Sequence, residues 1–224
     1  MKAYEYINFL VNSEAFQLAF KDVGDMSLNP TVTPTDEQVA NQARFVSFLN
    51  LANIEVHKRF SLIKRDTTLD MAVAGAEYSM PTDYLNLISA YYSVDGDEVP
   101  INNEKKNVVE GVDRAVSVLS SEPFKLKIKG TDLKERTDIV ATYAAAPKLL
   151  TKAAHDLNVP QVYTEAILNY AAYKAHSSVT GDIKAENNTY FMRYERSCKQ
   201  IETFGLVESD NLGSNTKLED NGFV

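Results

Sequence analysis

Residues 159–204 read VPQVYTEAILNYAAYKAHSSVTGDIKAENNTYFMRYERSCKQIETF and contain the longest run of apolar residues at helical spacing in the chain. Apolar residues that recur every three or four positions line one side of a helix. One such side is formed by Tyr163, Ile167, Tyr170, Ala171 and Lys174, and another by Asn187, Phe191, Tyr194, Cys198 and Ile201. The pattern predicts two helices, over residues 160–180 and 183–204.

The segment between these helices is only Thr180-Gly181-Asp182. Gly181 can adopt the left-handed conformation that ends a helix, and the Asp182 carboxylate can accept hydrogen bonds from the free amides of the next helix. A connection this short turns two helices back on each other. We therefore expect an antiparallel hairpin with an apolar seam, on which Cys198 is a small buried side chain rather than a reactive thiol.

Two more helices are predicted before this hairpin. Apolar residues share one side over residues 4–20, and Gly24 follows the end of this segment. The prolines at positions 30 and 34 then exclude a helix. Thr35, with Gln38 three residues later, is typical of a helix start and predicts a second helix over residues 36–59.

Residues 66–146 have the shorter periodicity of strands. Short strands are expected at 68–73, 77–81, 85–94, 98–101, 124–129 and 138–144, and Asp95-Gly96 predicts a tight hairpin turn. Residues 102–121 are polar and weakly periodic, which favours a loop with at most one helical turn.

The predicted fold class is α+β. It consists of a helical bundle, made of the N-terminal helices and the C-terminal hairpin, with a small antiparallel β-sheet inserted. We expect residues 1–204 to form a single domain. Residues 205–224 are acidic and poor in large apolar side chains, so we expect a flexible, extended arm.

The composition limits the class of protein. With 224 residues, 44% of them hydrophobic, the chain can form a substantial core. Its formal net charge of −8 argues against a primary role in gripping nucleic acid, although DNA can slide through an acidic channel. A single cysteine cannot form an internal disulfide, and neither a signal-peptide pattern nor a membrane-length apolar run is present. We expect the chain to be made and kept in a reducing cytosol.

The sequence predicts no catalytic, cofactor or metal site. The three histidines are far apart and lack partners at zinc-helix spacing, so surface or cap positions explain them better: His57, His155 and His176. Asp95, Asp97 and Glu98 resemble the start of a calcium loop, but the pattern stops, and a hairpin turn is the better interpretation. No glycine-rich phosphate loop, serine elbow or CxxC pair is present, and we expect no enzymatic activity. A small hydrolase with dispersed acids is the alternative left open.

One predicted strand has a basic side. Apolar residues at positions 124, 126 and 128 alternate with Lys125, Lys127 and Lys129, so the lysines share the opposite face. This face is either a solvated side of a half-buried strand, a lysine-protected sheet edge, or a stripe that contacts an acidic partner or DNA. The sequence alone is compatible with all three interpretations.

Three stretches carry a family resemblance. They are FLNLANIEV at 48–56, YSMPTDYL at 78–85 ahead of Asp95-Gly96, and the hairpin with Val159-Pro160, Glu165-Ala166-Ile167, Tyr170-Ala171, Gly181-Asp182, Ala185 and Tyr190-Phe191. In this order, and spanning residues 35–204, they resemble the head-to-tail adaptor proteins of short-tailed bacteriophages, the connector and tail-tubular subunits. The 102–121 segment is longer than the family needs, and residues 205–224 match no pattern of it.

The resemblance implies a structural virion protein at the head–tail interface, made in the host cytoplasm. Such subunits form a dodecameric ring that attaches to the portal protein and presents another surface to tail, nozzle or neighbouring ring proteins. Genome DNA passes through the central channel without specific binding, and no membrane is involved. Another ring or stopper lower in the tail stack, and a non-viral helical scaffold, are the alternatives.

Overall fold

The computed structural model describes residues 1–13, 15, 17–26, 33–72, 75–94, 97–102, 113–122, 124–130, 137–180 and 189–204. Contacts divide the chain into two compact units, a helical unit of Met1–Ala52 and Leu150–Val224 and a β unit of Asn53–Leu149. The fold is mixed α+β, as predicted from the sequence. That residues 1–204 act as a single domain stays a prediction.

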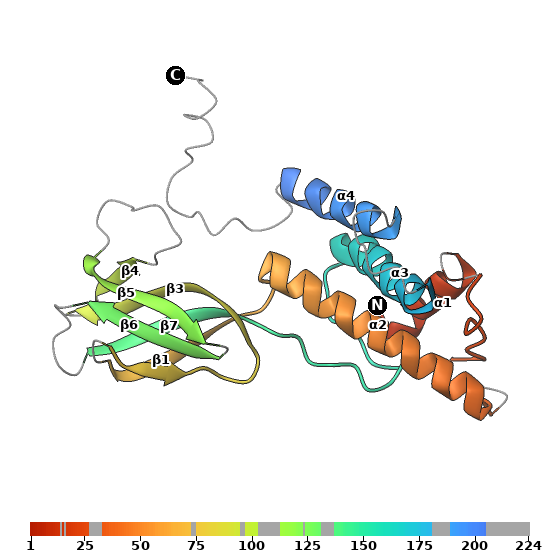
Figure 1. Cartoon of the computed structure of the whole chain (residues 1–224), viewed down its shortest axis with the longest axis horizontal. Coiled ribbons are helices and arrows are strands. Elements are labelled where there is room, and N and C mark those ends of the chain that lie inside the picture. The colour runs from red at the N-terminus through yellow and green to blue at the C-terminus, as the bar shows by residue number, and fades with distance from the viewer. Residues whose placement is uncertain are drawn as a thin grey trace, which may run out of the picture. The chain divides into compact units, whose positions relative to one another are not determined.

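The helical hairpin is present in the helical unit (Figure 1). A short 3-10 turn, η1 (Gln161–Tyr163), leads into α3 (Thr164–Thr180), and α4 (Thr189–Thr203) follows. Contacts run in opposite directions along α3 and α4, because the pairs are Asn169 with Ser197, Tyr170 with Tyr194, Tyr173 with Phe191 and His176 with Tyr190. The antiparallel arrangement is thereby confirmed. Residues 181–188, which include the predicted turn, lie outside the described residues.

The seam between α3 and α4 is apolar and aromatic. The ring centroids of Tyr170 and Tyr194 are 4.9 Å apart, and those of Tyr173 and Phe191 are 5.3 Å apart. Cys198 is fully buried, as predicted. Other buried side chains of the hairpin are Tyr163, Ala166, Ile167, Ala171, Ala172, Ala175 and Ile201.

The first helix, α1 (Ala3–Asn12), packs against α3 through a buried side that includes Tyr6 and Ile7. The prediction of a helix over residues 4–20 was wrong about its end. Ser13 leaves helical geometry, with φ −124° and ψ −90°, and its hydroxyl donates a hydrogen bond to the Phe9 carbonyl at 2.5 Å. Serine side chains compete in this way with the helix backbone, so they favour helix ends over interiors.

The long helix α2 (Asp36–Phe60) starts at the predicted cap. The Thr35 N–H donates to Gln38 Oε1 at 2.9 Å, and the Gln38 N–H donates to Thr35 Oγ1 at 3.2 Å, which confirms the capping box. Within the helical unit, the rings of Phe45 and Phe48 on α2 pack on Phe20, with centroids 5.5 and 6.1 Å away.

The β unit contains one seven-stranded sheet. Its strands are β1 (Lys64–Ala72), β2 (Glu77–Ser79), β3 (Tyr84–Val94), β4 (Asp97–Asn102), β5 (Asp113–Glu122), β6 (Lys125–Gly130) and β7 (Thr137–Ala145), in the spatial order β1-β7-β3-β4-β5-β6-β2. The recorded strand pairs are antiparallel except β4 with β5. Val94 pairs with Asp97, so β3 and β4 form the predicted hairpin, although Asp95-Gly96 itself lies outside the described residues.

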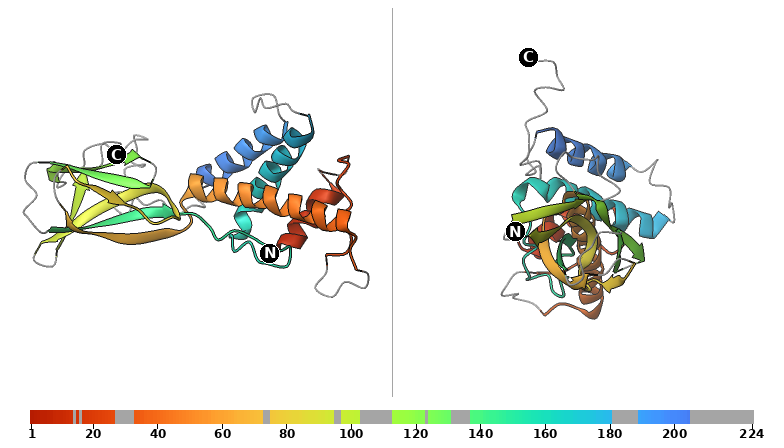
Figure 2. Two further views of the ribbon diagram at one scale, coloured as in Figure 1. Left: turned by 60° about the horizontal axis from the view of Figure 1, so that its bottom comes forward. Right: turned by 90° about the vertical axis from the view of Figure 1, so that its left-hand side faces the viewer.

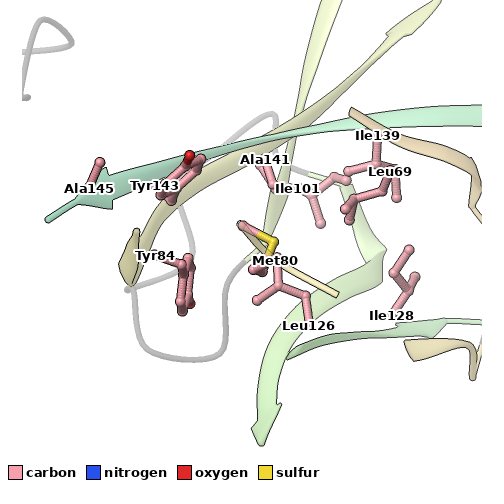
Figure 3. Close-up of a cluster of buried hydrophobic side chains, with 11 residues drawn as sticks. Leu69, Met80, Tyr84, Ile101, Leu126, Ile128, Ile139, Ala141, Tyr143 and Ala145 are labelled. Atoms are coloured by element: carbon pink, nitrogen blue, oxygen red, sulfur yellow. The ribbon is translucent and has the colours of Figure 1, made fainter. Parts of the chain in front are cut away.

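The sheet curls round on itself (Figures 1 and 2), and buried side chains of its strands form an apolar core. Leu69 on β1 and Leu126 and Ile128 on β6 come from near the two ends of the strand order, yet their side chains belong to one buried cluster (Figure 3). The edge strands β1 and β2 follow each other in sequence, and the Gly75 N–H between them donates to the Ile128 carbonyl at 2.7 Å. The chain itself therefore links the two edges of the sheet.

The expectation of a loop over residues 102–121 was wrong for its second half, because β5 occupies Asp113–Glu122. β5 pairs with β6 over most of its length, for example Val118 with Ile128. Backbone hydrogen bonding to a neighbouring strand has therefore imposed an extended conformation on a polar segment. Residues 103–112 lie outside the described residues.

Candidate interaction surfaces

The histidines occupy separate environments. His57 on α2 is buried, and its Nδ1 lies 2.8 Å from the Asn53 carbonyl. Burial lowers the pKa of His57 below its ordinary value of 6.5, and the backbone hydrogen bond opposes this shift only partly. His155 is exposed, and His176 stacks on Tyr190 with ring centroids 4.7 Å apart. Among the described residues, no group of three His, Cys, Asp or Glu side chains could hold a metal ion.

The three lysines of the predicted basic face belong to β6. Leu126 and Ile128 are fully buried, whereas Lys125 and Lys127 are half-buried on the other face. Glu77 on the paired strand β2 lies between the two lysines, with Nζ–Oε distances of 3.7 Å and 4.0 Å. β6 lies between β5 and β2, so these lysines do not protect a sheet edge.

Phe124 and Lys129 lie on either side of these residues in the sequence. Phe124 was expected on the buried side, but it precedes β6, has a positive φ of 60° and is 49% exposed. For Lys129 the backbone pairs with Ser117, and its side chain lies outside the described part of the structure. A partner-facing or DNA-facing role for Lys125, Lys127 and Lys129 stays a prediction.

A polar cluster surrounds Asp83, in the stretch that resembles the adaptor family. The Asp83 carboxylate accepts a hydrogen bond from Arg65 Nη1 at 2.6 Å and another from the Tyr143 hydroxyl at 3.1 Å. Burial raises the pKa of Tyr143, and the adjacent Asp83 carboxylate raises it further. This pKa favours the protonated phenol, which is the form that donates to Asp83. Asp83 therefore connects β1, β7 and the start of β3, a structural task that the sequence did not reveal.

The helical unit has a groove of about 490 Å³ between α1, α3 and α4. Its lining is mixed, with one exposed aromatic ring, two arginines, one glutamate and two amides: Phe9, Leu10, Ser13, Glu165, Leu168, Asn169, Arg193, Arg196 and Gln200. We call this groove the arginine groove. The sequence analysis did not find it, because its residues come from three helices that are far apart in the chain.

The outer face of α4 carries two large exposed apolar side chains. Met192 is 61% exposed and Phe204, just after the helix, is 72% exposed. They line a second hollow with Phe191, Glu195, Arg196, Lys199, Gln200 and Thr203. Arg196 and Gln200 also line the arginine groove, so the two hollows adjoin. Exposed apolar side chains rimmed by polar ones are typical of protein contacts.

We call this combined surface of α1 and α4, with Phe9, Met192 and Phe204 as its largest exposed apolar side chains, the helical contact face. Its chemistry fits docking to another protein better than catalysis, since it offers exposed apolar area with charged and polar side chains around it. Within the described ranges, no helix is both long and apolar enough to span a membrane.

Comparison with known proteins identifies the family of the chain. The family model described as SU10 adaptor protein matches residues 19–214, and none of the curated proteins matches the chain. The match includes most of the helical unit and all of the β unit. The chain therefore belongs to the SU10 adaptor family, a family of phage head–tail adaptors, as its resemblance to podovirus adaptors predicted.

Proposed function

We propose that this phage structural adaptor is one subunit of a dodecameric ring that joins the portal protein to the tail. In this proposal the ring encloses part of the channel through which the genome leaves the capsid. The observation that carries it is the match to the SU10 adaptor family over residues 19–214, which covers far more than an isolated motif.

The helical contact face supports a role in assembly. Met192, Phe204 and Phe9 are each more than half exposed, which is costly in water unless another surface covers them. In the ring, the helical unit supplies the contacts between subunits. The β unit and residues 205–224 reach the portal and the neighbouring tail or nozzle proteins.

The charge of the chain fits a DNA channel. A formal net charge of −8 per subunit, repeated around a ring, repels the phosphate backbone. DNA that is repelled by the wall slides without sticking. Lys125, Lys127 and Lys129 are proposed to contact an acidic surface of a neighbouring ring rather than DNA, because Glu77 already offsets part of the charge of the first two lysines.

Mixing the purified chain with its portal protein tests this proposal. Native mass spectrometry should find the portal with a full ring of adaptor subunits. The variant Met192→Asp/Phe204→Asp should keep its fold, since both side chains are exposed, and should lose ring formation. Val179→Asp is the matched control, because Val179 is 56% exposed on α3 but lines neither hollow of the helical contact face.

If the spectra show the portal without bound adaptor subunits although the wild-type chain is folded, the ring assignment is contradicted. Equal loss of assembly in the Val179→Asp control would show that the subunit contact lies elsewhere. Deletion of residues 205–224 should leave the melting temperature unchanged and weaken portal attachment. Unchanged portal affinity of the shortened chain would remove residues 205–224 from the proposed interface.

A further inference from the structure

A closed ring needs two different contact surfaces on each subunit. Subunits related by rotation around a ring meet head to tail, so a patch on one copy faces a different patch on the next copy. The helical contact face supplies one of these two surfaces. The surface that it meets should offer a hollow for an exposed apolar side chain and charges of opposite sign.

A hollow of this kind lies beside the first half of α2. Its volume is about 340 Å³, and all of its lining residues belong to the helical unit. The apolar part of the lining includes Met26, Pro34, Val39, Ala43, Val46 and Ala153. We call this hollow the α2 hollow. Within the helical unit, α4 and the start of α2 lie at opposite ends (Figures 1 and 2), so the α2 hollow is a surface separate from the outer face of α4.

The size of the α2 hollow suits the ring of Phe204. This side chain lies just after α4 and is 72% exposed, the largest exposed fraction among the large apolar side chains of the described residues. A cavity of about 150 Å³ is enough to hold a benzene molecule, so the α2 hollow has room for a phenyl ring. Insertion into a second copy would remove this ring from water.

The charges beside the two surfaces are opposite in sign. Arg196 and Lys199 are exposed on α4, and both line the same hollow as Phe204. Asp36 and Glu37 are exposed in the first turn of α2. A contact that brings Phe204 into the α2 hollow therefore brings the basic part of α4 towards the acidic start of α2. This complementarity favours a second copy of the chain as the occupant of the α2 hollow.

We propose that Phe204 of each subunit inserts into the α2 hollow of the next subunit around the ring. This contact presupposes the ring proposed above and names the surface that the helical contact face meets. Because the two surfaces differ, each added copy leaves one α4 side and one α2 side uncovered until the ring closes. A pair of copies related by a two-fold axis does not form through this contact.

Crosslinking in rings assembled on the portal tests this contact. One chain carries Thr203→Cys, next to Phe204, and a second chain carries Ala43→Cys, at an exposed position of the α2 hollow. The probe is a short, flexible bis-maleimide, and Cys198 is buried and stays in place. A mixture of the two chains should give crosslinked dimers, whereas neither chain alone should give them.

Val179→Cys in place of Ala43→Cys is the matched control, because Val179 is 56% exposed on α3 but does not line the α2 hollow. Equal crosslinking in this control, no crosslinking in the mixture, or dimers of the Thr203→Cys chain alone would overturn the contact. Rings that form without the crosslink overturn only this contact. A wild-type chain that forms no ring on its portal overturns the ring assignment and this contact together.

Filling the α2 hollow gives an independent measurement. Ala43→Trp should keep the melting temperature, since Ala43 is exposed, and should block the entry of Phe204. The chain concentration that loads half of the portals should rise about tenfold. Val179→Trp adds the same side chain outside the α2 hollow and should leave that concentration unchanged. Equal loading by the Ala43→Trp variant and the wild type would overturn the proposal.

Discussion

The side-chain amide of Asn50 forms two hydrogen bonds with the backbone of Leu150. Its Nδ2 donates to the Leu150 carbonyl at 2.9 Å, and the Leu150 N–H donates to its Oδ1 at 2.8 Å. Both residues belong to the helical unit, although 100 positions separate them. Asn50 on α2 therefore binds the first residue of the segment that follows the β unit in the sequence. This contact is a structural reason for an asparagine in the FLNLANIEV stretch.

Asn50→Asp should destabilise the chain by about 1–3 kcal/mol. The new carboxylate cannot donate to the Leu150 carbonyl, which loses its partner and faces a negative charge. Urea unfolding measures this change in the free energy of unfolding. Asn8→Asp on the exposed side of α1 is the matched control and should change stability by less than about 0.5 kcal/mol. Equal effects of the two substitutions would show that the Asn50 contact contributes nothing.

The hairpin seam gives a second prediction. Tyr170→Asp or Phe191→Asp should lower stability by about 3 kcal/mol, because each would place a charge among the rings of Tyr170, Tyr173, Phe191 and Tyr194. Met192→Asp is the control on the neighbouring, 61% exposed position. Thermal melting followed by circular dichroism should separate the variants. Equal melting temperatures of the Phe191→Asp and Met192→Asp variants would show that Phe191 does not belong to the hairpin seam.

The Asp83 cluster gives a third prediction. Asp83→Ala should cost about 2 kcal/mol, because it leaves the Tyr143 hydroxyl without its acceptor, while Tyr143→Phe should cost about 1 kcal/mol. The double variant should cost clearly less than the sum, since both single changes remove the same hydrogen bond. A double-mutant cycle measured by urea unfolding tests this coupling, and simple additivity would refute it.

Acidification should destabilise the chain through His57. Burial lowers the pKa of His57 in the folded state, so the unfolded chain binds a proton at higher pH than the folded chain does. The contribution of His57 to stability is therefore complete above pH 6.5 and is lost progressively as the pH falls below that value. His57→Gln should flatten the fall in melting temperature between pH 7 and about 5. His155→Gln, at an exposed position, should not flatten it.

Local signals in the sequence were sufficient for much of the fold. The Thr35–Gln38 cap and the alternation of Leu126 and Ile128 with lysines each depend on neighbouring residues, and the structure contains both features. The end of α1 was missed because the apolar pattern continues beyond Ser13, whose side chain ends the helix.

Features that depend on distant residues were not predictable. β5 is extended because it pairs with β6, and the polar composition of Asp113–Glu122 hides this pairing. The arginine groove brings together Phe9, Glu165 and Arg196 from three helices. The Asn50–Leu150 contact likewise exists only after the β unit has brought the chain back to α2.

A cryo-EM map of intact phage particles that carry this chain tests the central claim most directly. The account predicts a closed ring of copies between the portal and the tail, with the helical contact face between adjacent subunits and DNA in the central channel. A map in which the chain is absent from the head–tail junction, or is present there as isolated copies that leave the channel open at the side, would contradict it.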